Sequence, residues 1–160
     1  MKTIGLLGGM SWESTATYYQ VINRVIRQQL GGLHSAKLLL YSVDFQELET
    51  RMADGRWEEI AVILAGAARR LEQAGADFVL ICTNTMHKVA PQVQAQIQIP
   101  LLHIAQATAD ALRESGIRKT ALLGTKYTMT QDFYRRVLQQ NGIEALVPAE
   151  ADIEVVDRII

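Results

Sequence analysis

The sequence predicts an α/β protein with two pseudo-symmetric lobes, each a parallel β-sheet flanked by helices, the second lobe being incomplete. Two observations lead to this prediction. Short apolar segments alternate with helix-forming segments along the whole chain, which is the pattern of βαβ units. A strand followed by a glycine turn also opens the chain and recurs near residue 120. We expect the lobes to span residues 1–105 and 106–160.

The composition limits the classes of function. The 160 residues include 16 basic and 17 acidic side chains, giving a net charge of −1, so neither nucleic acid nor an anionic membrane is an expected partner. A single cysteine excludes an internal disulfide framework and disfavours a cysteine-based metal site. The chain shows no signal peptide and no apolar run long enough to span a membrane. We expect a cytoplasmic protein, and leave a homodimer open.

The first predicted element is a strand over residues 3–7. The turn Gly8-Gly9-Met10-Ser11 follows it, and its glycines let the backbone turn tightly and approach a ligand closely. A helix is predicted over residues 12–30, with Ser11 and Ser14 as candidate caps. The turn completes neither a dinucleotide-binding fingerprint nor a P-loop, so no cofactor is expected.

The next elements are a loop over residues 31–35, a strand over 37–43 and a short helix over 46–53. His34, in the loop, is expected to be solvated. Arg51, on the short helix, is a candidate partner for a substrate carboxylate, because a guanidinium group binds a carboxylate through two hydrogen bonds.

A strongly amphipathic helix is predicted over residues 57–74, where apolar residues recur at helical spacing. A buried strand over residues 78–81 then leads to Cys82, and a helix over 87–97 follows, with Thr83, Asn84 and Thr85 as candidate caps. Cys82 is therefore expected at the carboxyl end of a strand, partly accessible, where a helix N-terminus lowers the pKa of its thiol. The alternative is that Cys82 is a small buried apolar residue.

Two histidines lie near the same edge of the predicted sheet. His87 is in the first turn of the predicted 87–97 helix, and His103 ends a short segment over residues 101–104. We expect both to be structural, with a role as proton donor as the alternative. A helix over residues 105–115 closes the first half of the chain.

The pattern then restarts. Thr120-Ala121-Leu122-Leu123-Gly124-Thr125 resembles the first strand and its glycine turn, and Phe133-Tyr134 resembles Tyr18-Tyr19, at offsets of 116 and 115 residues. We interpret this as the start of a duplicated lobe, with a strand–helix–strand unit over residues 119–146 and a helix from Asp152. Chance similarity between two βα units is the alternative.

Three separated motifs together resemble the aspartate/glutamate racemase family, and most closely its broad-specificity bacterial branch. They are Gly8-Gly9-Met10-Ser11-Trp12-Glu13-Ser14, Cys82-Thr83-Asn84-Thr85-Met86-His87 and Leu123-Gly124-Thr125-Lys126-Tyr127-Thr128-Met129. The resemblance implies cofactor-independent racemisation of aspartate or glutamate, in which a thiolate removes the α-proton from one face and a thiol returns one on the other face. It implies Cys82 as one acid/base and a substrate site including Met10, Ser11, Thr83, Asn84, Thr85 and Thr125.

The chain departs from the family at the second catalytic cysteine. The repeat offset places that residue beyond Ile160, and Cys82 is the only cysteine in the chain. We therefore expect a truncated product or a decayed gene that racemises little or not at all. A single-thiol decarboxylase or isomerase on the same scaffold, or a non-catalytic carboxylate-binding module, are the alternatives.

Overall fold

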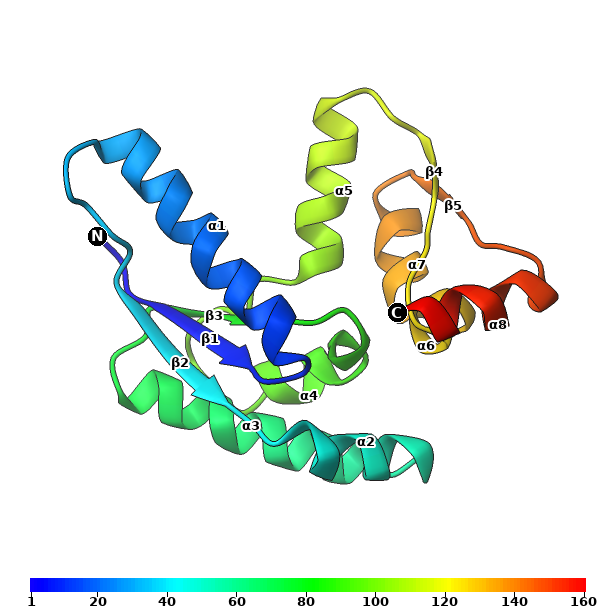
Figure 1. Cartoon of the computed structure of the whole chain (residues 1–160), viewed down its shortest axis with the longest axis horizontal. Coiled ribbons are helices and arrows are strands. Elements are labelled where there is room, and N and C mark those ends of the chain that lie inside the picture. Colours follow the sequence, from blue (N-terminus) through cyan, green and yellow to red (C-terminus); the bar gives the residue numbers. More distant parts are fainter. The chain divides into compact units, whose positions relative to one another are not determined.

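The computed structural model describes residues 1–160, which form two compact units (Figure 1). The first unit comprises Met1–Thr83 and Val89–Leu102, and the second comprises Asn84–Lys88 and His103–Ile160. Both units combine parallel strands with flanking helices, which confirms the predicted α/β class. No helix has the length and apolar character needed to cross a membrane.

The sheet of the first unit has three parallel strands in the order β2-β1-β3. They are β1 (Ile4–Gly8), β2 (Leu38–Ser42) and β3 (Phe78–Ile81). β1 lies in the centre, with Leu7 opposite Tyr41 on one side and Ile81 on the other. The predicted segment 101–104 contributes only an isolated bridge, between Leu101 and Val79.

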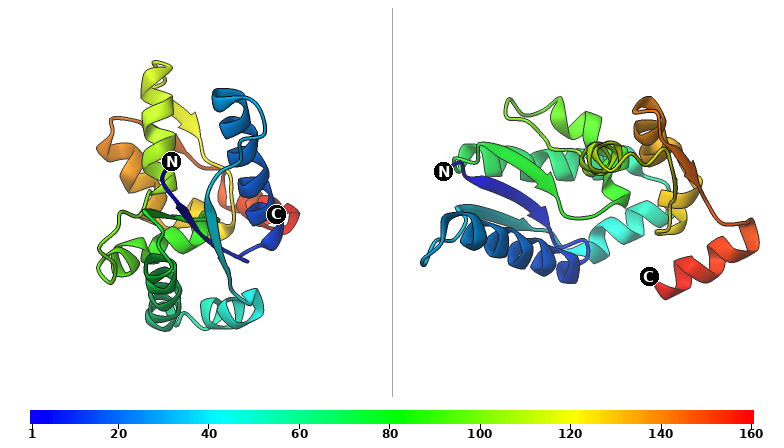
Figure 2. Two further views of the ribbon diagram at one scale, coloured as in Figure 1. Left: turned by 90° about the vertical axis from the view of Figure 1, so that its left-hand side faces the viewer. Right: turned by 90° about the horizontal axis from the view of Figure 1, so that it is seen from above.

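Helices cover both faces of this sheet. α1 (Trp12–Leu30) lies on one face, where a Cβ added to Gly8 would meet the side chain of Thr15. α3 (Trp57–Gln73) lies on the other face, where a Cβ added to Gly5 would meet Leu71. Figure 2 shows the strands between these two helices.

The amphipathic pattern predicted for residues 57–74 is confirmed in α3. Its buried side chains recur at helical spacing: Ile60, Ala61, Leu64, Ala65, Ala67, Ala68 and Leu71. α2 (Phe45–Ala53) precedes α3 and is capped by Asp44, whose carboxylate accepts a hydrogen bond from the Gln46 amide. The predicted helix over 46–53 is thus confirmed, with its start shifted by one residue.

The predicted helix over residues 87–97 is wrong in both its start and its length. The chain instead forms a 3₁₀ helix, η1 (Thr85–Val89), followed by the five-residue α4 (Ala90–Gln94). Pro91 lies in the first turn of α4. A proline disfavours α-helical geometry in the residue before it and has no N–H group to donate, so an α-helix running through this position is interrupted.

The second unit begins with α5 (Ile104–Glu114) and continues through β4 (Lys119–Ala121), α6 (Lys126–Thr130), α7 (Asp132–Gln140), β5 (Glu144–Leu146) and α8 (Glu150–Ile159). β4 and β5 pair in parallel, with Thr120 opposite Ala145. The strand, glycine turn, helix and parallel strand predicted over residues 119–146 are therefore present.

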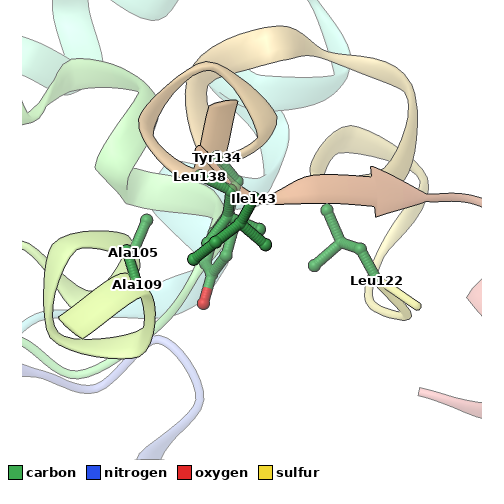
Figure 3. Packing of buried hydrophobic residues seen from close by; sticks show 6 residues of the cluster. All are labelled: Ala105, Ala109, Leu122, Tyr134, Leu138 and Ile143. Atoms are coloured by element: carbon green, nitrogen blue, oxygen red, sulfur yellow. The ribbon is translucent and has the colours of Figure 1, made fainter. Parts of the chain in front are cut away.

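The core of the second unit is formed mainly by α5, α7 and the β4–β5 region. Six buried residues make up this core, and Figure 3 shows them: Ala105, Ala109, Leu122, Tyr134, Leu138 and Ile143. The hydroxyl of Tyr134 lies 2.9 Å from that of Thr108, so the one polar atom that this tyrosine brings into the core has a partner.

Candidate functional site

Cys82 directly follows β3, at the carboxyl end of this strand. Its amide donates a hydrogen bond to the carbonyl of Leu7 at 3.0 Å, which extends the ladder between β1 and β3 by one residue. In sheets with this strand order, ligands bind outside the carboxyl ends of the strands, where the connections leave in opposite directions. The predicted position of Cys82 at a strand end is confirmed.

The predicted accessibility of Cys82 is wrong. The residue has 0% of its surface exposed, and Leu7 and Ile81 beside it are equally buried, at 0% and 1%. Burial raises the pKa of the Cys82 thiol from its usual 9.0 to about 12, because a thiolate is poorly solvated in apolar surroundings. The expected lowering by a helix N-terminus is therefore also wrong, and Cys82 is a thiol at neutral pH.

The glycine turn after β1 is built for close backbone contact. Gly9 has φ +91°, and a Cβ added there would lie 2.3 Å from the carbonyl oxygen of Val43. The Gly9 amide donates to the hydroxyl of Thr15 at 2.9 Å. Since a β-carbon would clash and φ is positive, this position requires glycine.

Ser11 caps α1, as predicted, by accepting a hydrogen bond from the Ser14 amide at 3.3 Å. Its side chain is exposed, whereas Met10 is buried at 2% exposure. Ser14 lies within the helix, and its hydroxyl is 2.7 Å from the carbonyl oxygen of Cys82 and 3.0 Å from that of Ser11. Ser14 thus ties the glycine turn to the Cys82 backbone, a contact that the sequence could not indicate.

Arg51 lies on α2 with its guanidinium group already engaged. Its Nε is 3.2 Å from a carboxylate oxygen of Glu59, and its Nη1 donates to the carbonyl of Glu47 at 2.6 Å. A substrate carboxylate would have to compete with Glu59 for this group. A role for Arg51 in substrate binding remains a prediction.

In the second unit, three threonine hydroxyls lie in a row. The Thr85 hydroxyl is 2.9 Å from that of Thr125, which is 3.4 Å from that of Thr128. Thr85 and Thr128 are buried, at 6% and 1% exposure, and Thr125 is partly exposed. Thr128 was not among the predicted site residues, although it stands in the third motif of the sequence.

Both histidines have structural roles at the start of α5, as predicted. The Ile104 amide donates to Nε2 of His87 at 3.1 Å, and the Ala105 amide donates to Nδ1 of His103 at 3.2 Å. The two rings meet edge to face, with centroids 4.5 Å apart. Burial lowers the pKa of His103 below its usual 6.5, so its Nδ1 remains an acceptor at neutral pH.

The predicted site residues divide between the two units. Met10, Ser11, Arg51, Cys82 and Thr83 belong to the first, and Asn84, Thr85 and Thr125 to the second. Asn84 is exposed and Thr83 partly exposed. A surface hollow of about 580 Å³ in the second unit is lined by Asp132, Arg136 and Glu144 among others, and by none of the predicted site residues.

Comparison with known proteins identifies the family. Residues 7–160 match the Asp/Glu/Hydantoin racemase family. The chain is 27% identical over 146 residues to the broad specificity amino-acid racemase RacX of Bacillus subtilis, covering 89% of this chain and 63% of RacX.

Two solved structures are similar in both sequence and fold. A candidate Asp/Glu racemase from Yersinia pestis is 54% identical, with a TM-score of 0.94, and the match covers 99% of this chain and 70% of that one. An aspartate racemase homologue from Pyrococcus horikoshii is 38% identical, with a TM-score of 0.89, covering 100% and 70%. The chain thus belongs to the Asp/Glu/Hydantoin racemase family and spans less than two thirds of the length of RacX.

Proposed function

We propose that this chain exchanges the α-proton of an acidic amino acid, aspartate or glutamate, through the single thiol of Cys82. The family match and the position of Cys82 at a strand end beside the glycine turn carry the proposal. The thiolate sulfur takes the α-proton and becomes a thiol, while the substrate becomes a carbanion stabilised by its carboxylate. Return of a proton from the same thiol restores the original configuration.

The buried thiol sets a condition on this chemistry. With a pKa of about 12, Cys82 holds its proton until a positive charge approaches. The ammonium group of a bound amino acid supplies such a charge, and an opposite charge within about 4–6 Å favours the ionised form. Substrate binding would therefore favour loss of the thiol proton to solvent water, which leaves the thiolate base, provided that the thiol becomes accessible to water when the substrate binds.

One thiol supports exchange but not inversion. Inversion needs a second acid on the opposite face of the α-carbon, and the chain has no second cysteine. We therefore expect negligible racemisation by this chain. No pyridoxal phosphate or metal is part of the proposal, since the thiol alone carries the proton.

The test is incubation with L-aspartate or L-glutamate in heavy water, followed by mass spectrometry and chiral chromatography. Deuterium at the α-carbon of the recovered L-amino acid, lost in Cys82→Ser and retained in His34→Ala on an exposed loop, is the expected result. Rapid formation of the D-amino acid would overturn the single-thiol mechanism. Absence of exchange from both substrates would overturn the catalytic proposal itself.

A second candidate function is a carboxylate-binding module without catalysis. The complete burial of Cys82 favours it, since simple binding needs no reactive thiol. Calorimetric titration separates the two: binding of L-aspartate that persists in Cys82→Ala, with no deuterium exchange in the unaltered chain, identifies a binding module.

A further inference from the structure

The hydroxyl of Ser14 holds the backbone of the residue that bears the only thiol of the chain. It donates a hydrogen bond to the carbonyl oxygen of Cys82 at 2.7 Å, while the Cys82 amide donates to the carbonyl of Leu7 at 3.0 Å. The two backbone polar groups of Cys82 are thus tied to different elements, the carbonyl to α1 and the amide to β1. With both groups held, the side chain stays in the core, where Cys82 is 0% exposed.

The two bonds that hold Cys82 differ in how easily they can be released. The bond to Leu7 continues the ladder between β1 and β3, and breaking it would leave a buried backbone amide without a partner. The bond to Ser14 is made by a side chain that is only half-buried. Thr83, on the far side of the Cys82 carbonyl, is also partly exposed, so a released carbonyl can be solvated. The thiol is therefore more easily uncovered by releasing the bond to Ser14.

The Ser14 hydroxyl has a second acceptor within reach. Its oxygen lies 3.0 Å from the carbonyl oxygen of Ser11, the residue that caps the same helix. A hydroxyl has a single hydrogen, so it can make a full hydrogen bond to only one of the two carbonyls at a time. The contact with Cys82 is the shorter one, and the Ser11 carbonyl already accepts from the hydroxyl of Thr15 at 3.0 Å. The bond to Cys82 is therefore the resting state, and the Ser11 carbonyl keeps the hydroxyl satisfied after release.

We propose that the Ser14 hydroxyl is a latch on the Cys82 thiol. While the hydroxyl binds the Cys82 carbonyl, the thiol is covered; when the hydroxyl turns to the Ser11 carbonyl, the thiol can reach the carboxyl edge of the sheet, where ligands bind in such folds. Ser14 is thus a positioning residue that acts through Cys82. The link between the open state and substrate binding rests on the proposed function, whereas the latch itself does not.

The latch accounts for the way in which a covered thiol can take part in proton exchange. If the substrate binds only the open state, its apparent dissociation constant is the intrinsic one divided by the open fraction. Removing the latch should raise that fraction about tenfold, because one hydrogen bond of this kind is of the order of the 1.4 kcal/mol that makes a tenfold change in an equilibrium constant. The KM of the proposed exchange should then fall about tenfold, with little change in kcat.

Alkylation of Cys82 by iodoacetamide in the folded chain tests the latch without any substrate. At a fixed pH, Ser14→Ala should raise the rate about tenfold, since it raises the open fraction by that factor. Ser14→Thr keeps a hydroxyl at the same position and should restore the slow rate. Thr17→Ala is the matched control, because the Thr17 hydroxyl lies on the same helix and donates to the Glu13 carbonyl at 3.1 Å. This variant should leave the rate unchanged.

The dependence of the rate on urea separates the latch from a loss of stability. Local opening exposes little surface, so a rate that follows it changes little in low urea, whereas a rate that follows global unfolding rises steeply. In both the unaltered chain and Ser14→Ala, alkylation in low urea should be nearly independent of the urea concentration. A steep dependence in the unaltered chain would show that Cys82 is reached only by global unfolding, and would overturn the latch without any variant.

The remaining outcomes distinguish the latch from the proposed function. An unchanged alkylation rate in Ser14→Ala, or an equal increase in Thr17→Ala, would show that Ser14 does not control access to the thiol. Faster alkylation of Ser14→Ala with an unchanged KM for deuterium exchange into L-aspartate would overturn the link to substrate binding. Absence of exchange in the unaltered chain would overturn the proposed function alone, since alkylation still decides whether the latch exists.

Discussion

Alkylation of Cys82 should be far slower in the folded chain than in the unfolded chain. Iodoacetamide reacts with the thiolate, so the rate follows the ionised fraction. At pH 8 a thiol with a pKa of 9.0 is about one tenth ionised, whereas a pKa of about 12 leaves about one ten-thousandth. The native rate should therefore be about 1000-fold lower from ionisation alone, and steric burial should lower it further.

Mass spectrometry measures this directly, because no second cysteine competes for the reagent. The same chain in concentrated urea provides the reference rate, and Cys82→Ser provides the blank. In a pH series from about 7 to 10 the native rate should rise about tenfold per unit throughout, while the unfolded rate levels off near its pKa. A native rate that levels off near pH 9, or approaches the unfolded rate at pH 8, would refute the assignment of a buried thiol.

Three further predictions concern stability, measured by urea unfolding. Gly9→Ala should lower the free energy of unfolding by about 3 kcal/mol or more, because it combines a positive φ with a backbone clash. Gly55→Ala, with φ +71° and open space around it, should lower it by only about 1–2 kcal/mol. Equal losses in the two variants would contradict the clash at Gly9. Leu138→Ala should destabilise the second unit by about 2–5 kcal/mol, whereas Leu123→Ala, at a 61% exposed position, should change stability little. The pKa of His103 is lower in the folded chain than its usual 6.5. Between the folded and the unfolded pKa the unfolded chain therefore binds more protons than the folded chain. The contribution of His103 to stability should be fully present above about pH 6.5 and should be lost as the pH falls below that value. His103→Asn keeps a capping acceptor and should flatten this pH dependence; an unchanged slope would show that another group causes it.

Local pattern was sufficient to predict the elements whose residues recur regularly. The buried face of α3 follows from its 3.6-residue spacing, and Ser11 was recognisable as a cap because it precedes the helix directly. The strands were recognisable as short apolar runs, and the repeat of strand and glycine turn correctly predicted the parallel pair of β4 and β5.

The surroundings of Cys82 were not predictable in the same way. Burial depends on neighbours from other parts of the chain, such as Leu7 and Ser14, which are 75 and 68 residues away in sequence. The error in the following helix had a visible signal, because Pro91 stands inside the predicted span. The row of threonine hydroxyls joins residues 40 positions apart, and no local pattern encodes such a contact.

The second unit is discontinuous in sequence, and this bears on how the protein can be divided. Residues Asn84–Lys88 belong to it, although they lie inside the span of the first unit. A fragment starting at His103 would lack Thr85, the partner of the Thr125 hydroxyl, and His87, the acceptor for the Ile104 amide. A single cut in the chain therefore cannot separate either unit whole.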